Sequence, residues 1–242
     1  MSYDFSASND AIAGTITAFA KPYSFGCWVK AANWTGEDCA MNVASARLAS
    51  DQCMINMGGG GANDVVRVED SMGASIAIAD FVAGAGEYDN TWVLVVAVIT
   101  GDADRDIYID GSANTTNTIN SAPYGTIVDN IIIGMRAQGG FQWPGLCAEA
   151  FLYNIALDGS QVDALISSPD TKSETGFPPT TVASANLVGY WSLSTDQSDH
   201  DDEGPNAGPT LSVESAAPFD ADHPTIISGT DTAIIVPTGP WR

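Results

Sequence analysis

The run TWVLVVAVITGDADRDIYIDG, residues 91–111, decides the fold class. Its first part, residues 92–99, is almost continuously apolar, as a strand covered on both faces should be. Its last part, IYID at residues 107–110, alternates apolar and polar side chains, which is the pattern of a half-buried strand. The acidic residues between the two parts predict a tight turn. The run therefore predicts a β-hairpin that leads into a second turn, and such strands are typical of a two-sheet sandwich.

The rest of the chain favours the same all-β architecture. Short apolar runs are separated by Gly, Asn, Asp and Ser, which suit tight reversals, and single sandwich domains can reach 242 residues. One short helix is the exception. Asp158 can cap it, Gln161 follows at capping-box spacing, and Val162, Leu165 and Ile166 form one apolar face.

A second block, residues 131–165, reads as a strand, a glycine-rich loop, a strand and the short helix. With the hairpin it resembles the laminin-G-like, or concanavalin A-like, jelly-roll superfamily. The matching features are Trp92, Tyr108 to Gly111, Ile133-Gly134, Gly145, Glu149, Tyr153-Asn154 and Leu157. The resemblance covers roughly residues 3–213 and includes LVGYWSL at 187–193, whose Trp191 it places in the core. It implies a two-sheet antiparallel jelly-roll sandwich, a fold that hosts lectins, adhesion modules, glycanases and virion proteins.

Two regions are predicted along the chain. Residues 1–213 form the sandwich, and residues 214–242 form an extended C-terminal tail. The tail has too few apolar residues for a core of its own, although exposure of its isoleucines and Trp241 to water would be unfavourable. We expect the tail to contact another subunit or copy by adding a strand to a sheet edge. The alternative is that the tail folds back over its own sandwich.

The charge of the chain excludes some partners. Eight Lys and Arg face 30 Asp and Glu, a formal net charge of −22. Nucleic-acid binding and anionic membrane surfaces are disfavoured, because both draw affinity from basic side chains. No stretch approaches the roughly 20 apolar residues of a membrane span, and the start MSYDFSASND does not resemble a secretory signal. The acidic surface suits a saline environment or the outside of an assembly.

Cys27, Cys39, Cys53 and Cys147 could form two disulfides in three pairings. We expect reduced thiols instead. Cys27 and Cys147 lie in apolar strands, where a free cysteine behaves as a small hydrophobe.

An acidic segment near residue 200 is the candidate metal site. Asp199, Asp201, Glu203 and Gly204 match positions 1, 3, 5 and 6 of an EF-hand calcium loop, but position 12 is Thr210 in place of the bidentate Glu. The segment is therefore either a Ca²⁺ site with Asp199, Asp201 and Glu203 as ligands or a solvated acidic turn.

The hairpin turn is a second acidic candidate. Asp102, Asp104 and Asp106 alternate there, and the resemblance raises calcium binding at such loop edges. Aspartates also stabilise turns through their own backbone, and this simpler interpretation is preferred.

The tryptophans divide into two groups. Those in predicted strands are assigned to the core: Trp28, Trp92 and Trp191. Those in loops or the tail are the candidates for glycan or partner contact: Trp34, Trp143 and Trp241. An exposed loop tryptophan can stack on a sugar face or anchor a protein interface.

Catalysis is not expected. Retaining glucanases of this fold need carboxylates at alternate positions of one strand, and no Glu-x-Asp-x-Glu strand occurs. His200 and His223 stand beside acidic or proline residues, without the setting of a catalytic triad.

These observations lead to a non-enzymatic virion structural protein, displayed on a bacteriophage surface as a capsid decoration, head-fibre or tail-associated protein. Its partners would be other virion proteins, such as a major capsid protein, or copies of itself, with a host glycan as a further candidate. The alternative is an extracellular, calcium-assisted, lectin-like carbohydrate-binding module.

Overall fold

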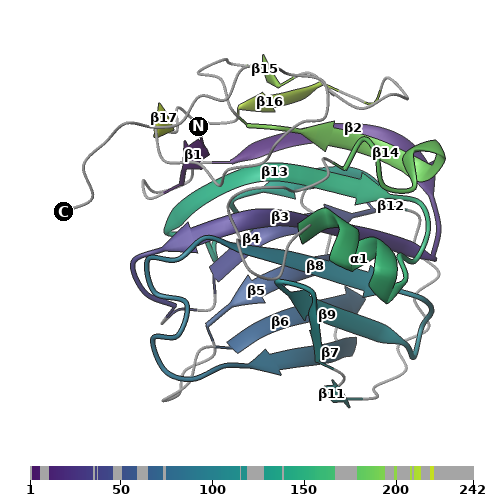
Figure 1. Cartoon of the computed structure of the whole chain (residues 1–242). Coiled ribbons are helices and arrows are strands. Elements are labelled where there is room, and N and C mark those ends of the chain that lie inside the picture. The colour runs from purple at the N-terminus through teal and green to yellow at the C-terminus, as the bar shows by residue number, and fades with distance from the viewer. Residues whose placement is uncertain are drawn as a thin grey trace.

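The structure is a computed structural model, and the predicted jelly-roll sandwich is confirmed: two antiparallel sheets pack face to face (Figure 1). The described residues are 2–5, 11–34, 36, 38–45, 51–58, 65–72, 75–114, 116–118, 128–137, 139–166, 179–193, 199–200, 208, 210–213 and 219–220.

Sheet A is the 8-stranded sheet. Its strands are β1 (Ser2–Asp4), β3 (Tyr23–Ala31), β8 (Val93–Ile99), β9 (Arg105–Ile109), β10 (Ser112–Asn114), β13 (Gly145–Tyr153), β14 (Leu187–Trp191) and β17 (Phe219–Asp220). They run in the order β10, β9, β8, β3, β13, β1, β17, and β14 also pairs with β13.

Sheet B is the 9-stranded sheet. Its strands are β2 (Ile12–Phe19), β4 (Asp38–Ala44), β5 (Gln52–Met57), β6 (Val65–Met72), β7 (Ser75–Val82), β11 (Thr116–Thr118), β12 (Val128–Ile133), β15 (Asp199–His200) and β16 (Leu211–Val213). They run in the order β11, β7, β6, β5, β4, β12, β2, β16, β15.

The predicted hairpin is confirmed as β8 and β9, which pair from Val95 opposite Ile109 to Ile99 opposite Arg105. In the first turn, the amide of Thr100 donates to the carbonyl oxygen of Asp104 at 3.0 Å. In the second turn, Asp110 and Gly111 both have positive φ, 47° and 77°. An Asp-Gly pair suits that geometry, because both residues tolerate the left-handed region.

The main core lies between the two sheets and includes Ile107, Ile133 and Trp191, as predicted. The predicted burial of Val96 and Phe151 is also correct, but these two side chains belong to a second cluster on the outer face of sheet A. Trp92 is only partly buried, so its assignment to the core is wrong. The reason is that β8 begins one residue later, at Val93, which leaves Trp92 at the margin of the second cluster.

The helix α1 (Gly159–Ile166) covers that second cluster (Figure 1). The predicted capping box is confirmed: the amide of Gln161 donates to Asp158 Oδ1 at 2.9 Å, and the amide of Asp158 donates to Gln161 Oε1 at 2.9 Å. The predicted apolar face of the helix, Val162, Leu165 and Ile166, is buried against sheet A. A 3₁₀ turn, η1 (Ser184–Asn186), leads into β14.

The predicted tail is described only at β17, where Phe219 and Asp220 pair with β1 of the same chain. That short segment therefore follows the fold-back arrangement. Residues 221–242, Trp241 among them, lie outside the described residues. The division at residue 213 and the docking of the tail on another subunit stay predictions.

All four cysteines are free and buried, which confirms the expectation of reduced thiols: Cys27, Cys39, Cys53 and Cys147. Burial raises the pKa of the Cys53 and Cys147 thiols well above the ordinary value. These thiols therefore act as apolar filling and are poor nucleophiles.

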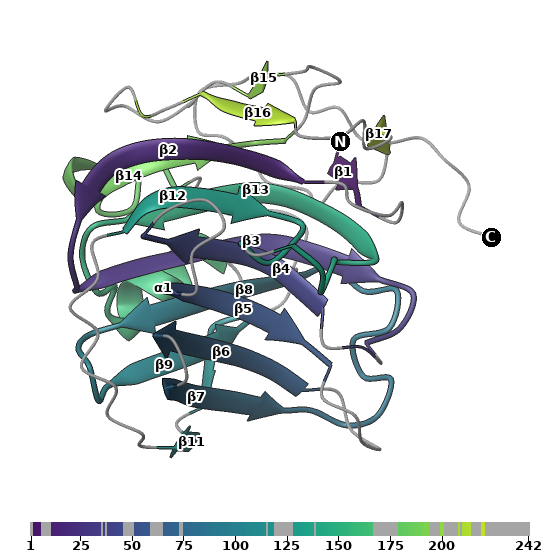
Figure 2. The same cartoon turned by 180° about the vertical axis from the view of Figure 1, so that it is seen from behind.

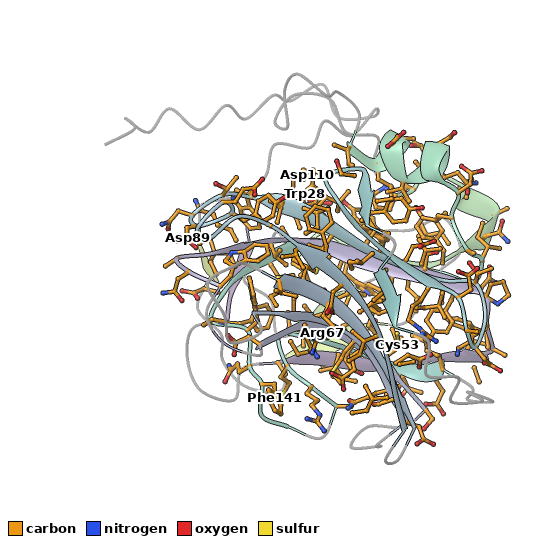
Figure 3. The ribbon with its side chains drawn as sticks, turned by 90° about the horizontal axis from the view of Figure 1, so that it is seen from below. Trp28, Cys53, Arg67, Asp89, Asp110 and Phe141 are labelled. Atoms are coloured by element: carbon orange, nitrogen blue, oxygen red, sulfur yellow. The ribbon has the colours of Figure 1, made fainter. Side chains whose placement is uncertain are left out.

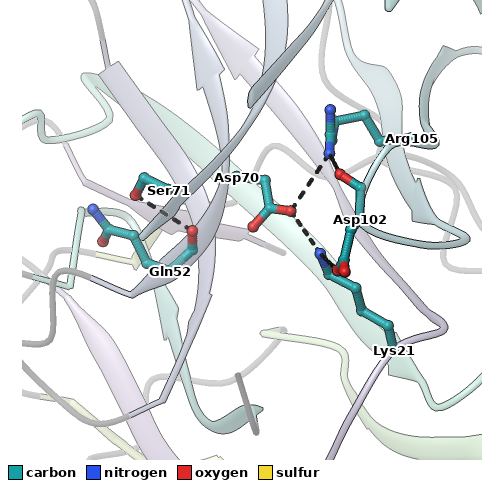
Figure 4. Close-up of polar contacts among 6 residues, drawn as sticks. All are labelled: Lys21, Gln52, Asp70, Ser71, Asp102 and Arg105. Atoms are coloured by element: carbon teal, nitrogen blue, oxygen red, sulfur yellow. Dashed lines mark hydrogen bonds and ion pairs between the residues drawn. The ribbon is translucent and has the colours of Figure 1, made fainter. Parts of the chain in front are cut away.

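A buried charge cluster holds one end of the sandwich (Figure 4). Lys21 Nζ lies 2.9 Å from Asp70 Oδ2 and 3.2 Å from Asp102 Oδ1, and Arg105 Nη2 lies 3.8 Å from Asp70 Oδ2. Arg105 Nη2 also donates to the carbonyl oxygen of Asp102. Burial raises the pKa of Asp70, and the neighbouring Lys21 partly offsets that rise. The cluster ties β6 to the turn before β3 and to the turn between β8 and β9.

Replacing Asp70 by alanine tests this role. Asp70 is the buried acid that Lys21 and Arg105 share, and removing one member of a buried pair leaves the other charge uncompensated. We expect Asp70→Ala to lower the free energy of unfolding by about 3–5 kcal/mol in urea denaturation. Asp102→Ala is the matched control: its side chain is 50% exposed, and its loss should cost about 1 kcal/mol or less. Equal small losses would contradict the structural role of the cluster.

Candidate functional site

The open sheet surface of the sandwich is found by asking which sheet faces are already covered. The inner faces pack on each other, and α1 with its flanking residues covers the outer face of sheet A. On the outer face of sheet B, Met135 and Ala137 pack on Ala44 and Ile132. Among the described residues, this covers the β12–β4 part and leaves β6 and β7, with Asn56 at the end of β5, at least partly exposed, whereas Gln52 and Met54 of β5 are buried; these strands are seen from the front in Figure 2.

Strand alternation sends a defined set of side chains outward from these three strands. Val66, Val68 and Ala79 point into the core, so their neighbours along β6 and β7 point away from it. We define the β5–β7 face by the outward residues Asn56, Arg67, Glu69, Ile76, Asp80 and Val82. Figure 3 places Arg67 on the opposite side of the sandwich from Trp28, which lies in the cluster under α1.

The polar side chains of the face are held in pairs. Arg67 makes a bidentate ion pair with Asp80 across β6 and β7, Nε to Oδ1 at 2.7 Å and Nη2 to Oδ2 at 3.0 Å. Their side chains are 27% and 26% exposed, so the pair is reachable from solvent. Asn56 Nδ2 donates to Glu69 Oε2 at 3.3 Å from the neighbouring strand. The groups are thereby fixed in position before any ligand arrives.

A buried amide pair supports the face from the side of β4. Asn42 Nδ2 donates to Gln52 Oε1 at 2.8 Å, and both side chains are buried. Ser71 Oγ donates to the carbonyl oxygen of Gln52 (Figure 4). These bonds join β4, β5 and β6 on the outer side of the sheet, which stiffens the surface on which the charged pairs stand.

The glycine-rich loop of residues 134–143 borders the face. It starts beside β4, where the amide of Gly134 donates to the carbonyl oxygen of Ala40, and returns so that the amide of Cys39 donates to that of Phe141 at 2.7 Å. Gly139 and Gly140 both have positive φ and open space around them, so they make the reversal at no steric cost. The reversal leaves the Phe141 ring 44% exposed, and the Arg136 guanidinium lies 4.9 Å from its centroid.

The strand register aligns the glycine-rich loop and the β5–β7 face along one line of paired residues that runs across the strands. Gln142 bridges Cys39, Cys39 pairs with Asn56, Asn56 with Arg67, and Arg67 with Asp80. With strands about 4.8 Å apart, Phe141 lies about three strand spacings, or about 14 Å, from Arg67.

Electrostatics link the same two elements. Burial raises the pKa of the Cys39 thiol, and the charges of Glu69 and Arg136 act on that pKa in opposite directions. Glu69 belongs to β6, and Arg136 belongs to the glycine-rich loop. Figure 3 shows Phe141 on the same side of the sandwich as Arg67.

The expectation that Trp34 and Trp143 are exposed loop residues is wrong. Their side chains belong to the core, with 3% and 1% exposure, and their rings meet edge to face at 6.0 Å. Trp143 Nε1 donates to the carbonyl oxygen of Leu146 at 3.1 Å, and the Trp34 ring packs on Tyr88 at 5.3 Å. The loops fold over the end of the sandwich, and these rings fill the space between the sheets. Neither ring presents a face to a ligand.

The aromatic residue that does reach the surface is Phe141, which the sequence analysis missed. A signal was present: Gly139-Gly140 directly precedes Phe141, and two such glycines can turn a loop so that the next side chain points outward. The third tryptophan candidate, Trp241, lies outside the described residues.

Of the three residues predicted to bind calcium, the structure describes only Asp199. The backbone of Asp199 forms β15 and pairs with Ser212 of β16, whereas Asp201 and Glu203 lie outside the described residues. Within the described ranges, no three His, Cys, Asp or Glu side chains are grouped to hold a metal ion. In the hairpin turn, Asp102 is paired with Lys21. Calcium binding by Asp199, Asp201 and Glu203 stays a prediction.

The two packed sheets define a two-sheet antiparallel β-sandwich. Residues 6–163 match the laminin-G-type family described as the Concanavalin A-like lectin/glucanases superfamily, and the chain belongs to that superfamily. Among curated protein sequences none matches the chain. No helix in the described ranges has the length and apolar character needed to span a membrane.

Two solved structures share the fold. One is a heptameric SAP-like pentraxin from Limulus polyphemus, with a TM-score of 0.52 and 14% identity, over 69% of this chain and 80% of that one. The other is a protein from Bacteroides ovatus that is described as carbohydrate-binding, with a TM-score of 0.52 and 12% identity. The match covers 88% of this chain and 58% of the Bacteroides protein, so the chain spans somewhat more than half of its length. At these identities the likeness concerns the fold alone.

Replacing Trp143 and Phe141 separately tests their assignment to core and surface. We expect Trp143→Ala to lower the free energy of unfolding by about 3–5 kcal/mol, because it empties a large buried volume. Phe141→Ala should cost about 1 kcal/mol or less, because much of that ring is already in water. Urea denaturation followed by circular dichroism measures both. A large loss for Phe141→Ala with a small one for Trp143→Ala would reverse the assignment.

Proposed function

We propose that the protein is a non-catalytic carbohydrate-binding module whose glycan lies along the β5–β7 face and the Arg136–Phe141 pair. One observation carries the proposal. The large apolar side chains that are exposed in the described ranges are Ile76, Val82 and Phe141. The first two lie on the β5–β7 face and the third in the loop that borders it. Apolar contacts thus lie beside paired polar groups on one side of the sandwich.

A sugar has both kinds of surface that such a face would bind. Its C–H face packs on an aromatic ring, which Phe141 offers, and its hydroxyl groups exchange hydrogen bonds with carboxylates, amides and guanidinium groups. Asp80, Glu69 and Asn56 supply the latter groups from neighbouring strands. Because they are already held in place by Arg67 and by each other, little side-chain freedom is lost on binding.

The length of the row favours an oligosaccharide over a single sugar. Phe141 and Arg67 are about 14 Å apart across the strands. The superfamily to which the chain belongs and the carbohydrate-binding description of the Bacteroides protein of the same fold support the same class of ligand.

A binding role without catalysis fits the carboxylates of the face. Glycoside hydrolysis needs two carboxyl groups that can act as acid and as base or nucleophile. On this face, Asp80 is engaged by Arg67 through both of its oxygens, and Glu69 accepts from Asn56. These bonds suit fixed hydrogen-bonding groups and oppose a change of protonation state during a reaction.

The setting of the module is a second part of the proposal. We infer display on the outside of a bacteriophage virion, as a capsid decoration, head-fibre or tail-associated protein that contacts a major capsid protein or its own copies. The net charge of −22 supports this setting, because it keeps densely displayed copies soluble and apart. An extracellular lectin is the alternative. Co-sedimentation of the protein with purified particles supports the virion setting, and its absence from them would exclude it.

Replacing the exposed ring tests the binding site. A panel of polysaccharides screened by affinity electrophoresis supplies a ligand, and isothermal titration calorimetry then measures Kd. We expect Phe141→Ala to raise Kd by about 3- to 10-fold, because an aromatic contact of this kind contributes about 0.5–1.5 kcal/mol. Asp104→Ala, in the turn between β8 and β9, is the control and should leave Kd unchanged. An unchanged Kd for Phe141→Ala would place the ligand elsewhere.

A further inference from the structure

The geometry of the β5–β7 face points to uncharged glycans as its ligands, an inference that rests on the proposed function and narrows it. Neutral hexose or pentose polymers would bind, whereas uronate, sulfate or sialic acid chains would not. The inference follows from where the described lysine and arginine side chains lie and which acids they contact.

The cations of the described ranges are Lys21, Lys30, Arg67, Arg105 and Arg136. Lys21 and Arg105 are held in the buried cluster at the end of the sandwich, and Lys30 is part of β3 in sheet A. Arg67 and Arg136 are therefore the cations of the face and its bordering loop.

Arg67 is already bound to an acid of its own chain. Recognition of a carboxylate or sulfate by arginine typically uses two parallel N–H donors, and this is the arrangement that Arg67 makes with Asp80 at 2.7 and 3.0 Å. Asp80 occupies the Nε and Nη2 edge of the Arg67 guanidinium and balances its charge, so an anionic sugar would meet a cation that is already neutralised. The Arg136 guanidinium lies 4.9 Å from the centroid of the Phe141 ring.

The acids of the face oppose an anionic ligand directly. Glu69 and Asp80 project from adjacent strands, and the chain as a whole carries a net charge of −22. A carboxylate or sulfate group of the ligand is repelled by these acids, which lowers both the affinity of an anionic glycan and its rate of association.

A neutral glycan meets no such penalty. Carboxylate oxygens have several lone pairs, so Asp80 and Glu69 can accept from sugar hydroxyls while they keep Arg67 and Asn56. The ion pair then serves as a preorganised acceptor for hydroxyl donors. Because the bound glycan carries no charge, its affinity should depend little on the salt concentration.

The test compares neutral with anionic polysaccharides on the intact chain. Dextran, mannan and arabinan represent neutral polymers, and heparin, polygalacturonate and polysialic acid represent anionic ones, each measured by biolayer interferometry at about 20 and about 150 mM salt. We expect binding to at least one neutral polymer, with Kd changing less than about two-fold between the salts. We expect no binding to the anionic polymers at either salt.

Each outcome has a distinct meaning. Binding to an anionic polymer that weakens as salt rises would overturn the inference and leave the proposed function standing. Binding to none of the polymers, neutral or anionic, would overturn the proposed function, and the inference with it.

A variant tests the local cause. Asp80→Asn keeps the shape of the side chain but releases Arg67 from its counter-charge, and we expect it to acquire measurable, salt-sensitive binding to an anionic polymer that the unchanged chain does not bind. Asp104→Asn removes the same charge from the turn between β8 and β9 and should give no gain. Equal gains in the two variants, or none in Asp80→Asn, would overturn the assignment to the Arg67–Asp80 pair. Thermal melting of both variants confirms that each is folded.

Discussion

The packing of two sheets against each other is the constraint on which the rest of the structure depends. A sandwich has two inner and two outer sheet faces, and the inner ones close the core around Trp191 and Ile133. The apolar outer face of sheet A needs its own cover, which α1 supplies with Val162 and Leu165. Among the described residues, the partly exposed surface lies on the outer face of sheet B, and beyond the part under Met135 and Ala137 it comprises the residues of the β5–β7 face.

Charge pairing then gives that open face its character. The chain has a net charge of −22 and few basic residues, and two of them, Lys21 and Arg105, are held in the buried charge cluster. On the open face, Arg67 neutralises Asp80 and holds it still. In the part of this surface that the structure describes, the polar groups are held in pairs and the charge of Arg67 is balanced by Asp80. Those properties favour a ligand with many hydroxyl groups and no charge, and they disfavour nucleic acid and anionic lipid for the same physical reason.

The sequence predicted what local patterns determine. Alternation and an Asp-Gly turn predicted β8 and β9, and the capping pair Asp158 and Gln161 predicted α1, because neighbouring residues set both structures. The candidate site depends on register between distant strands, which local patterns do not encode. The row from Phe141 to Asp80 depends on the bridge between Gln142 and Cys39, which are 103 positions apart (142 − 39), and on a bulge between Cys39 and Met41. The burial of Trp34 and Trp143 likewise follows from how the loops close over the core.

Hydrogen–deuterium exchange with mass spectrometry, with and without a bound neutral polysaccharide, tests most directly whether the β5–β7 face is the binding surface. Ligand contact should slow exchange in residues 65–82 and 134–143, the segments that carry Arg67, Asp80 and Phe141. Exchange in α1, on the opposite side of the sandwich, should stay unchanged. Protection confined to α1 and β14, with none in the two predicted segments, would contradict binding at this face.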